Sequence, residues 1–303
     1  MTATAVAALL IILLGWFAGR IGVVRRDAAP MLVQIVLYVA LPALVLRIMV
    51  TSTLDASLIL VPIVGFAVFG VLLVAAFTVA RIRRLDRPTT GALLVATAVG
   101  NTGFFGVPLI AASGPHLSVA AAIMYDTFCT AILTWTSTIR ISSRYGDRTA
   151  DGAPAGPLWR NLLLPPTWAL AIGLALNLAG VQDLPDWLDR TLVILGAAVL
   201  PLVLLYAGLV IEWDGIRRAW REVTASVAMR FILAPLVAYV VAVAFGLDGD
   251  VLRTVVLMAA MPTAMMSLVI GGWFKLRTDV IAGAVVASTL LATVALPVIR
   301  GIL

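Results

Sequence analysis

Apolar residues in this chain gather into long runs, and short polar stretches separate one run from the next. Each run is close to the ~20 residues that a helix needs to cross the hydrocarbon core of a bilayer. The pattern predicts an all-α polytopic membrane protein with ten transmembrane helices, numbered here in chain order as spans 1 to 10. The predicted spans cover residues 3–22, 30–50, 57–80, 89–112, 118–141, 161–180, 190–211, 222–245, 251–273 and 279–300.

The composition agrees with a membrane protein and argues against several other classes. Hydrophobic residues make up 62% of the 303 residues and charged residues 12%, which is too apolar for a soluble domain. With one cysteine, Cys129, and one histidine, His116, the sequence offers no internal disulfide and no typical metal cluster. It contains no phosphate-binding loop, no H-E-x-x-H motif and no nucleophile triad, so it indicates neither an enzyme nor an ATP-driven pump. We expect no cofactor beyond a coupled proton or sodium ion, and no nucleic-acid partner.

Basic residues alternate between the connections that join the spans. The odd-numbered connections carry Arg20, Arg25, Arg26, Arg81, Arg83, Arg84, Arg87, Arg140, Arg144, Arg148, Arg160, Arg217, Arg218, Arg221, Lys275 and Arg277, whereas the opposite side carries Arg47, Arg190, Arg253 and Arg300. Because cytoplasmic connections are enriched in Lys and Arg, we expect the odd-numbered connections in the cytoplasm and both termini in the periplasm. The preference for arginine over lysine and the abundance of alanine suggest a bacterial genome, hence a multi-pass protein of the inner membrane.

Two spans contain residues that interrupt a helix. Span 4 includes AVGNTGFFGVPL, where Gly100 and Gly103 loosen the helix and Pro108 removes a backbone donor. Asn101 places an amide where lipid offers no partner. Span 9 includes MPTAMMS, with a proline at Pro262. A helix broken at membrane depth must line a cavity or be buried in protein, and two broken segments in corresponding halves point to the binding site of a transporter.

The ten spans divide into two halves of five, and an odd number per half forces the halves into opposite orientations. We expect a first five-helix repeat over residues 1–141, a cytoplasmic linker over 142–160 and an inverted second repeat over 161–303. Weak matches occur in the same order in both halves: Gly15-x-x-x-Gly19-x-x-Gly22 with Gly173-x-x-x-Asn177-x-x-Gly180, Leu41-Pro42 with Leu200-Pro201, Pro62 with Pro235, and Asn101-Thr102 with Pro262-Thr263.

Four stretches carry a family resemblance: VLYVALPALVL in span 2, NTGFFGVPL in span 4, LPLVLLYAG in span 7 and MPTAMMSLVIGGWF in span 9. They resemble recurring stretches of the auxin efflux carrier family of membrane transporters, and the resemblance covers essentially the whole chain. It implies a ten-span inverted repeat shared with the bile acid sodium symporters, with spans 4 and 9 unwound and crossing near the midplane. Spans 1, 2, 6 and 7 would form a scaffold for a transport bundle of spans 3–5 and 8–10, which moves in an elevator-like way.

The resemblance also implies a class of substrate and an assembly. Members of the family carry small organic anions, and the fold implies a homodimer through spans 2 and 7. Two positions depart from the family pattern. Plant members have a proline where Gly100 stands, and many bacterial members have an asparagine where Met266 stands. The substrate or the coupling ion can therefore differ from those of relatives.

The crossing of spans 4 and 9 is the expected substrate site. The N-terminal ends of the half-helices carry partial positive charge, which favours a carboxylate. The candidates for substrate binding are Asn101, Thr102, Gly103, Pro262, Thr263 and Ser267, and those for shaping the crossover are Gly100, Pro108 and Pro262. The alternative is that glycine and proline are simply common in membrane helices, and that Asn101 joins one helix to another.

Asp126 in span 5 and Arg230 in span 8 are the candidates for ion coupling. A charged side chain at the membrane centre costs ~2.5–3.5 kcal/mol on insertion scales, so an intramembrane acid is a functional candidate by default. Asp126 could carry a proton, with Arg230 as its counter-charge. The alternative is that the two side chains merely neutralise each other or meet backbone groups.

Three functions stay open on the sequence alone. The first is a secondary transporter of a small organic anion, a carboxylate, as a uniporter or with a coupled proton. The second is a sodium-coupled carrier closer to the bile acid symporters, which Met266 and the lack of a nearby glutamate weaken. The third is a membrane sensor that binds a ligand without transporting it, for which we find no signalling domain in the sequence.

Overall fold

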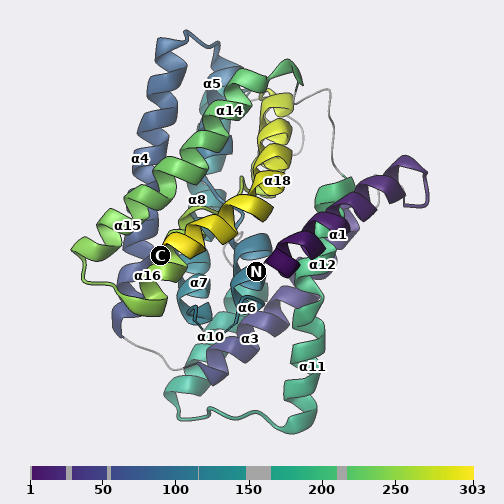
Figure 1. Cartoon of the computed structure of the whole chain (residues 1–303), viewed down its shortest axis with the longest axis vertical. Helices are drawn as coiled ribbons and strands as arrows, with labels where there is room; N and C mark the ends of the chain where they lie inside the picture. The colour runs from purple at the N-terminus through teal and green to yellow at the C-terminus, as the bar shows by residue number, and fades with distance from the viewer. Residues whose placement is uncertain (1, 25–28, 53–55, 115, 148–164, 210–216) are drawn as a thin grey trace.

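The computed structural model describes residues 2–24, 29–52, 56–114, 116–147, 165–209 and 217–303, most of which lie in helices (Figure 1). The helices of the first half are α1 (Thr2–Arg20), α2 (Ala29–Ile35), α3 (Leu41–Thr51), α4 (Val61–Ile82), α5 (Arg87–Ala98), α6 (Val107–Ala111), α7 (Val119–Tyr125), α8 (Ala131–Leu133) and α9 (Ile139–Tyr145). Those of the second half are α10 (Pro165–Leu178), α11 (Asp186–Ala197), α12 (Val199–Leu209), α14 (Trp220–Ala228), α15 (Ala234–Ala244), α16 (Gly249–Ala259), α17 (Met265–Trp273) and α18 (Thr278–Ile302).

Some of these helices are interrupted or extended by turns of a different width. One is a tighter 3-10 turn, η3 (Ala56–Leu60), which leads into α4. The others are wider π-helical turns: η2 (Val36–Ala40), η4 (Thr102–Gly106), η5 (Asp126–Thr130), η6 (Thr134–Thr138) and η8 (Met229–Leu233). Such π-turns inside α-helices occur frequently at functional sites, and the candidate residues Thr102, Asp126 and Arg230 all lie on them.

Several helical stretches are long and apolar enough to cross a membrane. They are Leu58–Ile82, Val119–Tyr145, Asp186–Leu209, Trp220–Ala244 and Thr278–Ile302, with shorter apolar helices at Leu10–Arg20, Val36–Thr51 and Thr102–Ala111. Large apolar side chains on α4 and α15, such as Val74 and Leu236, are more than half exposed. Extended exposed apolar surface of this kind marks contact with a membrane or a partner. The described chain is therefore all-helical with several membrane-spanning helices, as its apolar pattern predicts.

The helices pack in two groups (Figure 1). In the first group, α1 packs along α12, and α3 packs along α10 and α11. In the second group, α4 packs against α5 and α15, α15 packs against α16, and α18 packs against α5 and α14. In the view of Figure 1 the second group lies at the upper left and the first at the right and bottom, with α6, α7 and α8 toward the centre.

The basic connections meet at one end of the molecule. At that end Arg83 donates a hydrogen bond to the Arg221 carbonyl (3.0 Å), and Arg87 donates one to the Arg144 carbonyl (2.6 Å). Lys275 forms an ion pair with Asp147 (3.1 Å). These contacts join the third, fifth, seventh and ninth predicted connections. Arg300, on the predicted opposite side, donates instead to the carbonyl of Ser113 in the fourth connection (3.0 Å). This grouping agrees with the alternation of charge, and the assignment of that end to the cytoplasm stays a prediction.

Besides shifts of a few residues at several helix ends, the helices differ from the predicted spans most clearly in two places. Residues 142–145, expected to begin the linker, belong to α9, and residues 148–160 of that linker lie outside the described residues. Predicted span 7 is divided into α11 and α12 around Ala198. Pro201 lies in the first turn of α12, where its missing N–H removes no helical hydrogen bond.

Candidate functional site

Two interrupted helices cross and bond to each other through their backbones. Helix α5 ends at Ala98 and α16 ends at Ala259, and the segment that follows each helix is not helical. Gly100 and Thr263 form an isolated antiparallel β-bridge at the crossing. The N–H of Asn101 donates to the Pro262 carbonyl (2.6 Å), and the N–H of Ala264 donates to the Val99 carbonyl (3.0 Å). Both predicted helix breaks therefore exist, and each supplies the backbone partners that the other lost.

The crossing has local two-fold symmetry in its hydrogen bonds. A rotation about the bridge would exchange the two bonds, and would thereby relate Asn101 to Ala264 and Val99 to Pro262. The sequence alignment of the halves paired Asn101 with Pro262, which differs by two residues from this local correspondence. The shift matters because it places a small apolar residue, rather than a proline, at the position that corresponds to Asn101.

Asn101 and Thr102 line a pocket of about 90 Å³ beside the crossing, which we call the polar pocket after the polar side chains in its lining, although most of its surface is apolar. The Asn101 side chain is 3% exposed, and its amide nitrogen Nδ2 has no hydrogen-bond partner among the described residues. The Thr102 hydroxyl donates to Oδ1 of Asp126 (2.6 Å). Gly103 lies against the same carboxylate, since a methyl group at its Cα would approach Oδ2 to 2.8 Å. The remaining polar side chains of the pocket are Thr127, Thr130, Thr134, Trp135 and Thr167.

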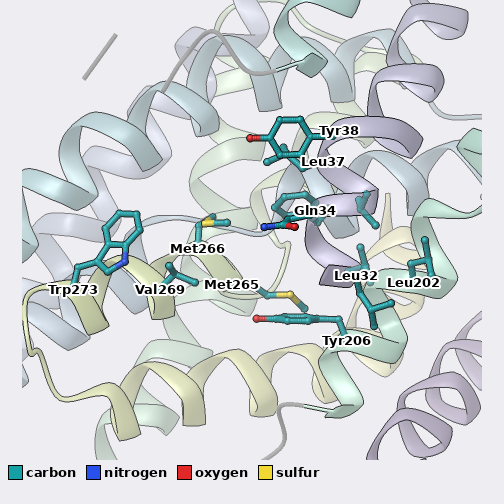
Figure 2. Close-up of a pocket in the computed structure, with 13 residues that line it drawn as sticks. Leu32, Gln34, Leu37, Tyr38, Leu202, Tyr206, Met265, Met266, Val269 and Trp273 are labelled. Carbon is teal, nitrogen blue, oxygen red and sulfur yellow. The ribbon is translucent and has the colours of Figure 1, made fainter. Parts of the chain in front are cut away.

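A larger apolar cavity of about 400 Å³ adjoins the polar pocket. Figure 2 shows side chains from α2, η2, α12 and α17 around this space, among them Gln34, Tyr38, Tyr206, Met265 and Trp273. The two hollows share a wall of four residues, Leu37, Phe104, Met265 and Met266. The site is therefore an apolar chamber with one polar end, where Asn101 and Asp126 lie.

The predicted residues of the second crossover lie elsewhere. Thr263 Oγ1 donates to the Ala96 carbonyl (2.8 Å), and its N–H donates to Ser288 Oγ (3.0 Å). Ser267 Oγ donates to the Val95 carbonyl (3.1 Å). Both side chains are fully buried and neither lines either hollow. Their hydroxyls are used to bind α5, so they brace the crossing and do not offer donors to a substrate.

The residues predicted to shape the crossover are at the break. Pro108 is buried in α6, which continues the π-turn η4 without a break, so its missing N–H leaves one helical hydrogen bond unmade next to the π-turn. Pro262 contributes the carbonyl that holds Asn101. Gly100 leaves room for a guanidinium, because a methyl group at its Cα would collide with Nη2 of Arg230.

The expected pairing of Asp126 with Arg230 is wrong. No ion pair joins them among the described residues. Asp126 accepts from Thr102, whereas the guanidinium of Arg230 donates to backbone carbonyls of Met261, Ala259 and Thr97. Of the alternative, mutual neutralisation is likewise wrong, and the contact with backbone groups holds for Arg230, whereas Asp126 meets the side chain of Thr102. Each charge therefore has its own environment, and they can have separate roles.

Sequence reasoning missed most of the apolar chamber. Tyr38, Tyr206 and Trp273 lie in stretches that the family resemblance marks, but a single aromatic residue in an apolar span carries no signal of its own. Met265 and Met266 line both hollows; the sequence drew attention to Met266 only as a departure from the family pattern, and it gave no signal for Met265.

A family model described as "Membrane transport protein" matches residues 1–151 and 156–300. The chain belongs to this family, the auxin efflux carrier family. The chain is 29% identical over 301 residues to an uncharacterized transporter of Methanothermobacter thermautotrophicus, with 98% of this chain and 96% of that protein covered. It is 26% identical over 292 residues to an uncharacterized transporter of Methanocaldococcus jannaschii, with 93% of this chain and 92% of that protein covered.

A plant relative matches part of the chain. Auxin efflux carrier component 7 of Arabidopsis thaliana is 29% identical over 141 residues, which is 45% of this chain and 23% of that protein. The family and these relatives are transporters rather than enzymes, and the chain is accordingly a membrane transporter of this family.

Proposed function

We propose that the chain is a secondary transporter of a small organic anion whose carboxylate binds at the helix crossing. One observation carries this proposal: Asn101 lines the polar pocket, and its buried amide nitrogen has no hydrogen-bond partner in the part of the chain that the structure describes. A buried donor without a partner costs about 1–3 kcal/mol, so a ligand oxygen that accepts from it is bound favourably. A carboxylate is the acceptor that best fits, because hydrogen bonds to charged groups are the stronger ones.

The backbone supports an anion in the same place. Helix α17 begins at Met265, just after the crossing, and the first crossover resumes helical conformation at Thr102. Helix N-termini leave N–H groups unpaired and carry about half a unit of positive charge. The two ends flank the pocket lined by Asn101, Ala264 and Met265. Their field favours a carboxylate over a neutral group.

Asp126 lines this pocket too, and its presence favours proton coupling. Two like charges 4 Å apart repel by about 4 kcal/mol at an effective dielectric constant of 20. An anion and an ionised Asp126 therefore exclude each other, whereas a protonated Asp126 admits the anion. Substrate and proton would then travel together, with Thr102 holding the carboxyl in place.

The adjoining apolar chamber indicates what else the substrate carries. Methionine, tyrosine and tryptophan side chains surround about 400 Å³ of space, which can hold the apolar body of a small carboxylate (Figure 2). Methionine adapts to differently shaped ligands because its unbranched side chain is flexible and polarisable. A carboxylate with an apolar body fits this site better than a compact dicarboxylate, for which a second set of donors would be needed.

We propose the inverted ten-helix repeat and the elevator movement as the mechanism. The pairs of packed helices support a repeat, because they match when the halves are exchanged. Helix α1 packs on α12 and α10 packs on α3; α4 packs on α5 and α15 on α16; α18 contacts α5 and α7 contacts α16. The first group of helices would be the scaffold and the second the moving bundle. Both termini would be periplasmic in a bacterial inner membrane, and the scaffold would form a homodimer.

A two-step experiment tests the proposed function. The purified protein is first heated with a panel of mono- and dicarboxylates, and a ligand that binds the folded state raises the melting temperature. A labelled carboxylate selected in this way is then used for counterflow in proteoliposomes, with and without sodium and with an imposed pH gradient. We expect exchange that needs no sodium and accumulation that follows the proton gradient. Binding without counterflow would support a sensor, and a strict need for sodium would support the sodium-coupled alternative.

A further inference from the structure

We propose that Arg230 is a built-in cation of the transporter, whose guanidinium does at the crossing what a bound sodium ion does in a sodium-coupled carrier. Transporters with broken helices commonly hold their coupling cation among unwound backbone carbonyls and the C-terminal ends of half-helices. Arg230 meets carbonyls of both these kinds. The structural role of Arg230 is independent of the proposed function, and only its consequence for the coupling of transport rests on that function.

The Arg230 side chain donates four hydrogen bonds to backbone oxygens. It extends from the π-turn η8 in the middle of the apolar stretch Trp220–Ala244 and is 2% exposed. Its Nε donates to the Met261 carbonyl (2.9 Å), and its Nη2 donates to the carbonyls of Met261 (2.5 Å) and Ala259 (3.0 Å). Its Nη1 donates to the Thr97 carbonyl (3.3 Å). One cation thus joins three carbonyls from both halves of the chain.

Two of these carbonyls belong to the negative ends of the two interrupted helices. Thr97 is in the last turn of α5, Ala259 ends α16, and Met261 belongs to the unwound segment that follows. A helix C-terminus carries about half a unit of negative charge, so two such ends together balance one guanidinium. This balance explains how a buried arginine that has no carboxylate partner among the described residues is tolerated.

The space at the crossing is shaped for the guanidinium. A methyl group at Gly100 would collide with Nη2, so a glycine at this position admits the arginine. The cavity that borders Arg230, Gly100 and Tyr125 has a volume of about 10 Å³. Such a volume holds about one water molecule, which leaves no room for a hydrated ion beside the side chain.

A tethered cation has a direct consequence for coupling. A sodium ion can leave during the transport cycle, whereas an arginine stays in place and remains charged at all physiological pH values. The guanidinium then balances the negative helix ends at the crossing in every state of the transport cycle, and a sodium ion cannot drive transport by binding at this position. Asp126 is left as the acid that can exchange an ion with the solution.

The experiment measures thermal stability without any substrate. Wild type, Arg230→Met, Arg230→Ala and Arg230→Lys are purified in detergent and melted in choline chloride, sodium chloride or methylguanidinium chloride at equal ionic strength and about 50 mM, far below denaturing concentrations. We expect wild type to melt alike in the three salts. Arg230→Ala should melt at a lower temperature in choline and recover by about 2–4 °C in methylguanidinium, with a smaller recovery in sodium, because the vacated site binds a cation.

Arg300→Ala is the matched control. Arg300 also donates to a backbone carbonyl, that of Ser113, but outside the crossing. Its variant should show no recovery specific to methylguanidinium or sodium.

Two results would overturn the role of Arg230. The first is a wild type that is itself stabilised by sodium over choline, since a separate cation site would then exist. The second is an Arg230→Ala protein that melts alike in all three salts. If that variant cannot be purified, the yields of Arg230→Lys and Arg230→Met decide: lysine should retain more folded protein than methionine, and equal loss contradicts the role. Failure of the carboxylate screen would leave these outcomes unchanged, so the two proposals can fail separately.

Discussion

The two crossover segments have matching backbones and different side-chain tasks. Each breaks a helix, and each donates one N–H to a carbonyl of the other. In the first segment the side chains of Asn101 and Thr102 line the polar pocket, and the Asn101 amide has no partner among the described residues. In the second segment Thr263 and Ser267 use their hydroxyls on carbonyls of α5. In the proposed function the first crossover thus offers the Asn101 amide to a ligand, and the second holds the crossing together.

The difference shows that the symmetry of a crossing does not extend to its chemistry. The residue related to Asn101 by the local two-fold is Ala264, which has no side-chain donor. Substitutions in the second crossover should therefore reduce stability and spare ligand affinity, and substitutions at Asn101 should do the reverse. The predictions below are arranged from the largest expected effect to the smallest.

Gly100→Ala should destabilise the protein most. The added methyl group displaces the Arg230 guanidinium from its carbonyls, and a buried charge without its partners costs about 3–5 kcal/mol. We expect little folded protein after detergent extraction, measured by size-exclusion chromatography. Gly70→Ala is the control, because a methyl group there meets nothing within 4 Å. A Gly100→Ala protein as stable as Gly70→Ala would show that the contact with Arg230 does not constrain this position.

Thr263→Val should lower stability by about 1–3 kcal/mol and leave ligand affinity unchanged. The substitution removes the donor to the Ala96 carbonyl at a fully buried position. Thr191→Val removes a similar bond to a carbonyl of its own exposed helix, and its effect should stay within about 0.5 kcal/mol. Thermal melting measures both. A tenfold loss of affinity in Thr263→Val would place this residue among the substrate contacts after all.

Asp126→Asn should uncouple transport from the proton gradient. Asparagine keeps an oxygen that accepts from Thr102, so the pocket retains its shape, but the side chain no longer takes up a proton. One coupled proton per substrate gives about tenfold accumulation per unit of pH gradient, equal to about 1.4 kcal/mol, and this accumulation should disappear. Counterflow without a gradient should persist. Asp250→Asn, outside the pocket, should behave as wild type, and gradient-driven uptake that survives in Asp126→Asn would exclude Asp126 as the proton carrier.

Ser267→Ala should have the smallest effect of these substitutions. Its hydroxyl donates to the Val95 carbonyl at 3.1 Å, and one ordinary hydrogen bond contributes about 0.5–1.5 kcal/mol. The melting temperature should fall less than in Thr263→Val, with no change in ligand affinity. A loss of affinity without a loss of stability would contradict the bracing role of the second crossover.

Most of the fold follows from the sequence because lipid imposes strong rules. Apolar runs of about 20 residues predict the membrane-spanning helices, and the alternation of arginine predicts on which side of the membrane each connection lies. Glycine and proline within a run predict a broken helix. The crossing of α5 with α16 is consistent with that reasoning. The division of predicted span 7 at Ala198 and the π-turns carry no comparable signal, because they depend on how neighbouring helices pack.

The candidate site could be predicted only in part. Asn101, Thr102 and Asp126 attract attention because polar groups are costly in a membrane. Whether a hydroxyl meets a ligand or a backbone carbonyl depends on residues that are far away in the sequence. The hydroxyl of Thr263, for example, donates to the carbonyl of Ala96, which is 167 residues away. The same limit explains the wrong pairing for Arg230, since carbonyl acceptors exist at every residue and leave no mark in a sequence.

The affinity of Asn101→Ala for the carboxylate found in the screen tests the central claim most directly. Removing the amide should weaken binding by about tenfold to a hundredfold, because a hydrogen bond to a charged group contributes about 1.5–3 kcal/mol. The ligand-free protein should melt at the same or a higher temperature, since the lost donor has no partner in the described protein. Asn101→Asp should bind more weakly still, because it sets a negative charge against the anion. If Asn101→Asp binds the carboxylate as tightly as wild type, the carboxylate does not meet Asn101.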